Sequence, residues 1–302
     1  MGKIRFGRYT VETSNEDKVL FPKDKITKGE LVDYYQKIGS IMVPYTKNRP
    51  ISMVRYPDGI TAEGWYQKDA GSYFPSWIKT ISIKKKENGI TNYVMINNVA
   101  TLVYLANQAM IAPHVWLSRA DKLNYPDRMI FDLDPSGKDF NMVRRGALII
   151  KNFLDQLKLT SFVMTTGSKG LHVVVPLKRV HIFDWVREFA NKIGSIMVEQ
   201  NPDLFTIEIR KNKRKDLVFI DTLRNAFGQT GIAPYGVRPK PGAPIAAPLE
   251  WDEVKDSRLT PNRYTIRNIF KRIDKFGNVW GDIDEKVANL SNSHKILDTL
   301  KL

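Results

Sequence analysis

The sequence predicts an α/β fold in which short strands alternate with amphipathic helices. Through the middle of the chain, apolar runs of strand composition alternate with longer segments of helical spacing, an order typical of α/β proteins. The length of 302 residues allows one large domain or two smaller ones, each able to bury an ordinary core. The sequence contains no internal repeat.

The first clear element is a helix near the N-terminus. Thr27 and Glu30 have the spacing of a capping box, in which each side chain bonds the backbone N–H of the other residue. Apolar residues then recur at helical spacing up to Pro44, which predicts a helix over Lys28 to Val43.

A strand and a second helix are predicted next. Ile51 to Tyr56 has strand composition and is followed by a Pro-Asp-Gly turn. An apolar stripe follows Asn98 and is interrupted at Pro113, which predicts a helix between them. The uncharged stretch from Thr91 to Ser118 contains too many Asn, Gln, Pro and His residues for a membrane span. We therefore expect buried soluble structure here and no membrane partner.

The middle of the chain provides most of the predicted sheet. Its elements are a strand over Met129 to Asp134, a helix near Asn141 to Leu157, strands over Phe162 to Thr165 and Leu171 to Pro176, a helix near Phe183 to Val198, and a short apolar run over Leu217 to Ile220. Tyr235 to Pro248 is rich in proline, so we predict irregular structure that wraps over the surface. From about Trp251 the chain is mixed, helical in parts, and ends in a polar tail.

Charge and composition narrow the classes of function. Lys and Arg number 47 against 32 Asp and Glu, a net charge of +15, which favours an extended anionic partner, nucleic acid first. A merely solubilising surface and an anionic membrane are the alternatives. The absence of Cys excludes disulfides, thiolate metal sites and Cys nucleophiles. Because the N-terminus lacks the apolar core of a signal peptide, we expect a cytoplasmic protein.

Two aspartates form the first candidate site. On the predicted strand, Asp132 and Asp134 point to one face and Leu133 to the other. Two carboxylates so close together repel each other unless a cation lies between them, so this spacing suits a hard divalent metal ion. The alternative is a strand end whose second Asp caps a turn after Pro135.

A glycine-containing loop forms the second. Thr166 to Gly170 joins two predicted strands and contains two glycines, hydroxyl side chains and a lysine, which is typical of a phosphate-binding turn. His172 follows at the start of the next strand and can donate to a phosphate oxygen, while Lys169 supplies a charge. A Gly-Ser hairpin with an incidental His is the alternative. The loop lacks the spacing and following helix of a Walker loop.

Asp221 is the third candidate carboxylate. It ends an apolar run, as Asp134 does, and can supply the further anionic ligand that a two-metal site needs. A helix N-cap is the alternative. Asn225 and Gln229 follow at intervals of four and would share a face if the segment is helical, although Gly228 weakens that interpretation.

These motifs resemble the polymerase domain of bacterial ligase D and its stand-alone archaeal relatives, in the archaeo-eukaryotic primase superfamily. The resemblance covers most of the chain, over Lys18 to Pro22, Ile26 to Leu31, Val54 to Gly59, Gln67 to Lys68, Tyr104 to Gln108, His114 to Arg119, Asp132 to Pro135, Ser168 to His172, Asp221 to Thr230 and Val237 to Pro244. It implies a primase-polymerase catalytic fold, with a central mixed or antiparallel sheet flanked by helices. It also implies one domain over 1–302, with a DNA-end-binding part at 1–125 and a catalytic core at 126–250.

The resemblance also implies roles for individual residues. Two Mn²⁺ or Mg²⁺ ions would be bound by the catalytic Asp132, Asp134 and Asp221. The incoming nucleotide would be contacted by His114, Ser168, Lys169, His172, Gln229 and Arg238. The DNA would be contacted by Lys18 and Lys28 at a 5′-phosphate, by Trp65 and Tyr66 near the template, and by Arg55. Each role has a structural alternative. The lysines could simply be solvated, Arg238 could satisfy nearby carbonyls, and the aromatic pair could be core residues with one exposed partner.

The implied activity is template-dependent polymerisation. The enzyme would add nucleotides, preferentially ribonucleotides, to 3′ ends at gaps and double-strand breaks during non-homologous end joining. Its substrates would be nucleoside triphosphates and DNA ends with a 5′-phosphate. Because the chain has no K-x-D-G ligase signature, we expect a separate DNA ligase and a Ku-type end-binding protein as partners.

Three other interpretations stay open at this point. Phe131 to Asp134 also resembles the first motif of haloacid dehalogenase-type phosphatases, but it lies in mid-chain and Asp221 has no acidic neighbour. A DNA-end-binding module with a decayed catalytic site is a second alternative, although carboxylates in a basic groove are costly without metal. An initiating primase is a third.

Overall fold

The computed structural model describes residues 2–85 and 88–300, and the chain divides into two compact units. The first unit is Met1–Asp121, Thr230–Ala246 and Tyr264–Arg272, and the second is Lys122–Gln229, Ala247–Arg263 and Ile273–Leu302. The single domain over 1–302 with parts at 1–125 and 126–250 stays a prediction. In the two-unit division the segment after Gln229 returns to the first unit.

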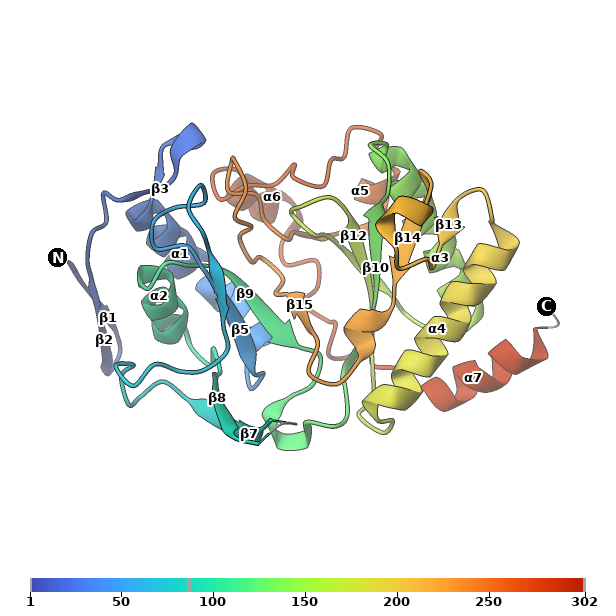
Figure 1. Ribbon diagram of the computed structural model, residues 1–302, viewed down its shortest axis with the longest axis horizontal. Coiled ribbons are helices and arrows are strands. Elements are labelled where there is room, and N and C mark those ends of the chain that lie inside the picture. The colour runs from blue at the N-terminus through green and yellow to red at the C-terminus, as the bar shows by residue number, and fades with distance from the viewer. Residues whose placement is uncertain (1, 86–87, 301–302) are drawn as a thin grey trace. The chain divides into compact units, whose positions relative to one another are not determined.

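The first unit contains a four-stranded sheet of order β15-β9-β5-β6, whose neighbouring strands are all antiparallel (Figure 1). These strands are β5 (Ile51–Arg55), β6 (Trp65–Gln67), β9 (Met110–Trp116) and β15 (Thr230–Ile232). Three hairpin pairs complete its strands: β1 (Gly2–Phe6) with β2 (Tyr9–Thr13), β3 (Val19–Phe21) with β4 (Ile26–Thr27), and β7 (Thr80–Lys84) with β8 (Ile90–Val94).

Helix α1 (Lys28–Thr46) begins at the predicted capping box, since Thr27 Oγ1 accepts from Glu30 N at 3.2 Å and Glu30 Oε2 from Thr27 N at 3.0 Å. Its predicted end at Pro44 was wrong, because the helix continues to Thr46. Pro44 removes one hydrogen bond, to the carbonyl of Ser40. Ser40 is exposed, so solvent can replace that bond.

Helix α2 (Val99–Asn107) is shorter than predicted. Asn98 caps it by accepting from Thr101 N at 2.8 Å. Ala109 then adopts a left-handed conformation, with φ of 57°, and Met110 already belongs to β9. Pro113 lies within that strand opposite Met53 and does not end a helix. The apolar stripe therefore belongs partly to a helix and partly to a strand. Short apolar runs do not distinguish these two structures.

The proline-rich segment is buried, which contradicts the prediction that it wraps over the surface. Tyr235, Val237 and Ile245 are fully buried. Tyr235 N donates to Ala246 O at 2.7 Å, and Val237 N donates to the hydroxyl of Tyr35 on α1 at 3.1 Å. The apolar residues between the prolines fill the core of the first unit. The hydrogen bonds above satisfy buried backbone N–H groups that a helix or sheet would otherwise pair.

The second unit contains the six-stranded mixed sheet of order β13-β14-β10-β12-β11-β16, in which only β13 and β14 pair in parallel. Helices α3 and α4 both pack against β10, beside which they lie in Figure 1. The predicted strands and helices of this region are all present, as β10 (Arg128–Pro135), α3 (Phe140–Gln156), β11 (Phe162–Thr165), β12 (Leu171–Pro176), α4 (Phe183–Gln200) and β14 (Val218–Asp221).

The remaining elements are β13 (Phe205–Thr206), β16 (Pro248–Leu249), α5 (Trp251–Lys255), α6 (Ile269–Phe276) and α7 (Leu290–Thr299), the last three in the region predicted to be partly helical. The predicted α/β (α+β) class is confirmed, with helices flanking a mixed sheet. Across the described ranges, every helix is too short or too polar to cross a membrane.

Candidate active site

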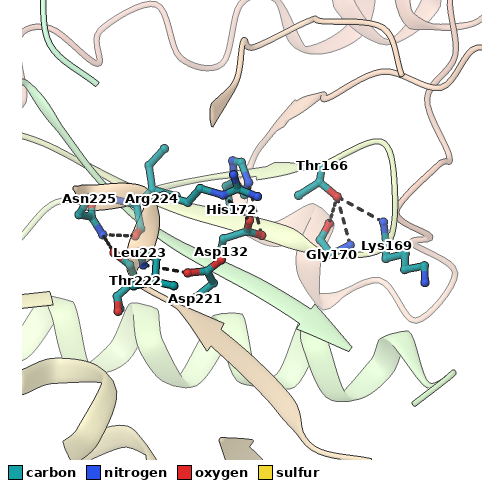
Figure 2. A network of polar contacts seen from close by, with 11 residues as sticks. Asp132, Thr166, Lys169, Gly170, His172, Asp221, Thr222, Leu223, Arg224 and Asn225 are labelled. Carbon is teal, nitrogen blue, oxygen red and sulfur yellow. Dashed lines mark hydrogen bonds and ion pairs between the residues drawn. The ribbon is translucent and has the colours of Figure 1, made fainter. Parts of the chain in front are cut away.

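Strand register in the second unit brings the candidate catalytic residues together. Asp132 on β10 stands opposite His172 on β12 and, on its other side, opposite Asp221 on β14. Asp134 follows two residues along β10, on the same face. Figure 2 shows Asp132 between His172 and Asp221. Asp221 ends β14, as its place after an apolar run suggested, and its partner in the sheet is Asp132, while Asp134 pairs with Phe219.

Asp132 has two positively charged or ionisable neighbours. Its side chain is almost fully buried, with its Oδ1 atom 3.4 Å from His172 Nε2 and its Oδ2 atom 3.3 Å from Arg224 Nε. Burial alone would raise the pKa of Asp132, but His172 and Arg224 outweigh it and lower that pKa. Of the three candidate carboxylates, Asp132 is therefore the one whose ionised form is favoured.

The other two carboxylates are shifted in the opposite direction. Burial and then the charge of Asp132 raise the pKa of Asp134 to about 6. Burial also raises the pKa of Asp221, with Asp132 adding to the effect. Such shifts are those of like charges that share a site. A cation between these groups would relieve the repulsion.

These residues fit a divalent metal ion by chemistry. Three carboxylates supply the oxygen donors that Mg²⁺ and Mn²⁺ prefer, and Asp132 Oδ1 is buried with the long 3.4 Å contact to His172 Nε2 but no hydrogen bond of good geometry. In the described ranges no three His, Cys, Asp or Glu side chains are grouped so that they hold an ion as they stand. The guanidinium of Arg224 provides the positive charge beside Asp132 in this arrangement.

The loop between β11 and β12 is organised by Thr166. Its hydroxyl accepts from the backbone N–H groups of Ser168, Lys169 and Gly170 at 3.3, 3.3 and 3.1 Å (Figure 2). The phosphate-binding turn predicted here would have used such N–H groups, but they are directed at the hydroxyl. Any contact with phosphate therefore falls to the side chains of Ser168 and Lys169.

Gly170 fixes this loop against β10. A Cβ atom at this position would lie 2.0 Å from the carbonyl oxygen of Leu133 and 2.9 Å from Asp134 Oδ1, so only glycine allows this approach. Lys169 is exposed and lines a cavity of about 710 Å³ together with Ser136 and Lys138. The loop thus lies next to Asp134 and faces a cavity whose lining carries two lysines, Lys138 and Lys169, and two aspartates, Asp139 and Asp216.

The segment after Asp221 is a tight turn and does not form the predicted helical face. Asp221 Oδ1 accepts from Leu223 N at 2.8 Å, so this carboxylate bonds the first residue of a 3-10 turn (η4, Leu223–Asn225) whose N-cap is Thr222. Asn225 is buried and bonds both the N–H and the carbonyl of Ile130, at 2.8 Å each. Gln229 is exposed and lies beyond the turn. Asn225 is therefore a structural residue that holds the turn on β10.

In the first unit, the two predicted lysines lie close together. Lys28 N donates to Lys18 O at 2.8 Å, and the two ammonium charges interact. Burial and then Lys18 lower the pKa of Lys28, whose Nζ atom donates to Asn107 O at 3.2 Å. Lys18 Nζ forms an ion pair with Asp58 at 2.6 Å. Two positive charges at one place suit a bound anion.

The candidate template residues form an exposed aromatic surface in the same unit. Trp65 and Tyr66 are 47% and 62% exposed, so neither is a core residue. The guanidinium of Arg55 lies 5.5 Å from the centre of the Trp65 ring and donates to the hydroxyl of Tyr73 at 3.0 Å. The Tyr66 ring contacts the edge of His114 at 5.7 Å between ring centres.

The two remaining nucleotide candidates of this unit are buried or half-buried. His114 lies on β9 opposite Ser52 and Ile232 and is only 7% exposed. Arg238 lies in the proline-rich segment, where its backbone N–H donates to Pro244 O at 2.7 Å. Their contact with a nucleotide remains an expectation from the resemblance.

Comparisons with known proteins agree with this arrangement. The family model described as LigD, primase-polymerase domain, matches residues 27–280. The chain is 33% identical to the multifunctional non-homologous end joining protein LigD of Mycolicibacterium smegmatis, covering 94% of this chain and 37% of that protein. It is 32% identical to the bifunctional non-homologous end joining protein LigD of Bacillus subtilis, covering 86% and 42%. The chain thus spans about two-fifths of the length of these relatives.

A solved structure gives the same result. The polymerase domain from Mycobacterium tuberculosis ligase D, in complex with DNA, superposes with a TM-score of 0.86 at 28% identity, covering 92% of this chain and 99% of that one. The chain therefore belongs to the LigD primase-polymerase domain family. This confirms the resemblance and the fold, and it identifies the chain as a metal-dependent nucleotidyltransferase by class.

Several residues of these sites were not identified from the sequence. They are Arg224 beside Asp132, Lys138 at the cavity, Asp58 beside Lys18, Asn107 beside Lys28 and Tyr73 beside Arg55. Asp58 and Asn107 lay inside motifs that resemble the family, but nothing in a single sequence shows which side chains those motifs face. Arg224 follows Asp221 by three positions, a spacing with no recognisable meaning outside a helix.

Proposed function

We propose that this chain is a template-dependent polymerase that adds nucleotides, preferentially ribonucleotides, to 3′ ends at gaps and double-strand breaks in non-homologous end joining. The observation that supports this most is the register of β10, β12 and β14, in which Asp132 lies between His172 and Asp221. The net charge of +15 suits a DNA substrate.

Asp132, Asp134 and Asp221 would hold two ions, Mn²⁺ or Mg²⁺. A bound pair of ions supplies charge stabilisation to the attacking 3′-hydroxyl and the leaving pyrophosphate. Arg224 and His172 keep Asp132 ionised, which leaves it ready to exchange the guanidinium of Arg224 for an ion.

The incoming nucleotide would be contacted by the side chains of Ser168, Lys169 and His172, with Gln229, His114 and Arg238 added by the resemblance. Lys169 lines the cavity of about 710 Å³, where its ammonium group would pair with a phosphate of the triphosphate. Thr166 holds the loop in one conformation through three backbone N–H groups, which would limit the ordering required on binding.

The DNA would be held by the first unit. Lys18 and Lys28 would bind the 5′-phosphate at the far side of a gap, and Trp65, Tyr66 and Arg55 would contact the template strand. Exposed aromatic rings next to a guanidinium are suited to stacking with bases. A DNA ligase activity and a Ku-type protein would complete the repair reaction.

Primer extension on gapped DNA with a 5′-phosphate, with Mn²⁺ or Mg²⁺ and with ribo- or deoxyribonucleotides, tests this function. We expect template-directed addition to the 3′ end, more efficient with ribonucleotides. Failure to extend any primer with either metal would refute the proposal. Efficient synthesis on a template without a primer would instead indicate an initiating primase.

A further inference from the structure

Lys18, which we propose binds the 5′-phosphate, forms an ion pair with Asp58, a residue to which the proposed function gives no role. Lys18 and Asp58 are 41% and 75% exposed, and their charged atoms lie 2.6 Å apart. The pair places a carboxylate against a lysine proposed to bind phosphate. Any phosphate that reaches Lys18 must therefore compete with Asp58.

The backbone holds this carboxylate in place. Gly59 N closes the turn onto Tyr56 O at 3.1 Å, and Ile60 N donates to Leu20 O of β3 at 2.8 Å. Gly59 has a φ of 85°, and a Cβ atom there would lie 3.1 Å from Leu20 O. The turn that carries Asp58 is thus fixed against the strand that follows Lys18.

The two lysines are fixed in the same way. Lys28 N bonds Lys18 O at 2.8 Å, and the Lys28 ammonium bonds Asn107 O. Asn107 Oδ1 accepts from Ser14 N, and its Nδ2 atom donates to Glu12 O, both at 3.1 Å. The site is therefore preformed, with two cations and two neighbouring carboxylates: Glu16, whose charge acts on Lys28, and the exposed Asp58, which pairs with Lys18.

Charge then decides which anion can displace Asp58. A phosphodiester carries one negative charge, as the carboxylate does, so replacing one by the other gains little. A terminal phosphate carries a charge of about −1.5 to −2 at neutral pH. It therefore binds the lysine pair more strongly than a phosphodiester or the carboxylate of Asp58 does. Asp58 thus weakens contact with continuous DNA backbone more than contact with a phosphorylated end.

We propose that Asp58 is a specificity-determining residue, whose carboxylate competes for Lys18 and so favours terminal 5′-phosphates over the phosphodiesters of continuous DNA. This inference rests on the proposed binding of DNA ends by Lys18 and Lys28. It gives Asp58 a role opposite to that of a residue that positions Lys18 for phosphate. The two roles predict opposite effects of removing its charge.

The experiment is equilibrium binding of the full chain to three DNAs of one sequence: a gap with a 5′-phosphate, the same gap with a 5′-hydroxyl, and uninterrupted duplex. Asp58→Asn keeps the size of the side chain and removes its charge. We expect it to strengthen binding to the hydroxyl gap and the duplex most, and to lower the preference for 5′-phosphate about two- to five-fold, as for an exposed ion pair.

Asp33→Asn is the matched control, because Asp33 forms an exposed ion pair with Lys37 on α1 at 2.6 Å and its loss changes the net charge equally. It should leave the preference unchanged. An unchanged or increased preference in Asp58→Asn, or an equal effect of both variants, would overturn the inference while leaving end binding intact. Absence of any preference in the wild type would overturn the proposed end binding as well.

Discussion

The two charged clusters of the molecule are built in opposite ways. Asp132, Asp134 and Asp221 lie on adjacent strands of one sheet, and burial is the largest contribution that raises the pKa of the last two. Lys18 and Lys28 lie at a hairpin and a helix N-terminus, and Lys18 retains an exposed internal counter-ion. In the acidic cluster Arg224 and His172 pair with Asp132 but leave the pKa values of Asp134 and Asp221 raised, whereas in the basic cluster Lys18 has an exposed counter-ion.

This difference indicates what each cluster requires. The sheet places three carboxylates close enough together that the pKa values of two of them are raised, and a divalent cation would relieve this repulsion. The lysine cluster already has a competing anion, so its gain from a ligand is smaller and depends on the charge of that ligand. We therefore expect substitutions in the acidic cluster to lower the rate of nucleotide addition strongly. Substitutions in the lysine cluster should change the preference for one DNA end over another only moderately.

The largest expected effect is loss of catalysis on neutralising the acidic cluster. Asp132→Asn should lower primer extension roughly 1,000-fold, since metal-bound charge stabilisation contributes several kcal/mol and each 1.4 kcal/mol is about tenfold in rate. Asp134→Asn and Asp221→Asn should be similarly impaired. DNA binding should persist, because the excess of Lys and Arg supplies affinity.

Asp252→Asn is the control for this series, because Asp252 is an exposed acid of the same unit that pairs only with nearby Lys255 in the described contacts. Single-turnover extension would measure the effect. Wild-type rates in any of the three variants would remove that residue from the catalytic site.

The next effect concerns the stability of the metal-free protein. The pKa of Asp134 is raised to about 6 from 3.8, so the folded state binds this proton more tightly than the unfolded state. Ionisation of Asp134 therefore lowers the free energy of unfolding. This loss of stability is absent below about pH 4 and complete above about pH 6. Asp134→Asn should raise the free energy of unfolding by roughly 1–3 kcal/mol at pH 8.

Urea denaturation of both proteins in the presence of a chelator, at pH 4.5 and pH 8, measures this difference. The variant should be the more stable protein at pH 8, and its advantage should shrink at pH 4.5. A difference that does not depend on pH would contradict the assignment of strain to the charge of Asp134.

A smaller effect is expected at the basic cluster. Lys28→Ala should weaken binding to gaps with a 5′-phosphate roughly tenfold, the contribution of one charge-assisted hydrogen bond, and should affect 5′-hydroxyl gaps much less. Lys37→Ala, which removes an exposed lysine of the same helix, is the control. Equal losses on both substrates would make Lys28 a nonspecific contact.

The smallest effect concerns sugar selection. Ser168 lies on the loop that Thr166 holds, with its own N–H bonded to that residue, and its small hydroxyl can exchange a hydrogen bond with a 2′-OH. Ser168→Ala should lower insertion efficiency with ribonucleotides about fivefold, the value of a neutral hydrogen bond, and largely spare deoxyribonucleotides. Equal loss with both nucleotides in single-insertion kinetics would exclude Ser168 as the sugar sensor.

Local signals in the sequence were sufficient for much of the second unit. The alternation of Asp132, Leu133 and Asp134 needs only the two-residue period of a strand, and β11 and β12 begin and end where their composition predicted. The capping box at Thr27 likewise marked the start of α1. Each of these features depends on residues a few positions apart, which is the range that a single sequence reports.

Features that depend on distant parts of the chain were not predictable in this way. The pairing of Asp221 with Asp132 is set by strand register, and the contact of Arg224 with Asp132 joins residues 92 positions apart. The proline-rich segment is buried because α1 and the segment itself supply its hydrogen bonds. Its composition alone suggested a surface strap.

Binding of Mn²⁺ to the isolated protein tests the central claim most directly, since it does not require DNA, nucleotide or activity. Calorimetric titration of the wild type, Asp132→Asn and Asp221→Asn would compare their affinities, with Asp252→Asn as the control. The account predicts that the wild type and the control bind Mn²⁺ alike, and that both active-site variants bind it much more weakly. Equal affinity in all four proteins would contradict a metal site at Asp132, Asp134 and Asp221.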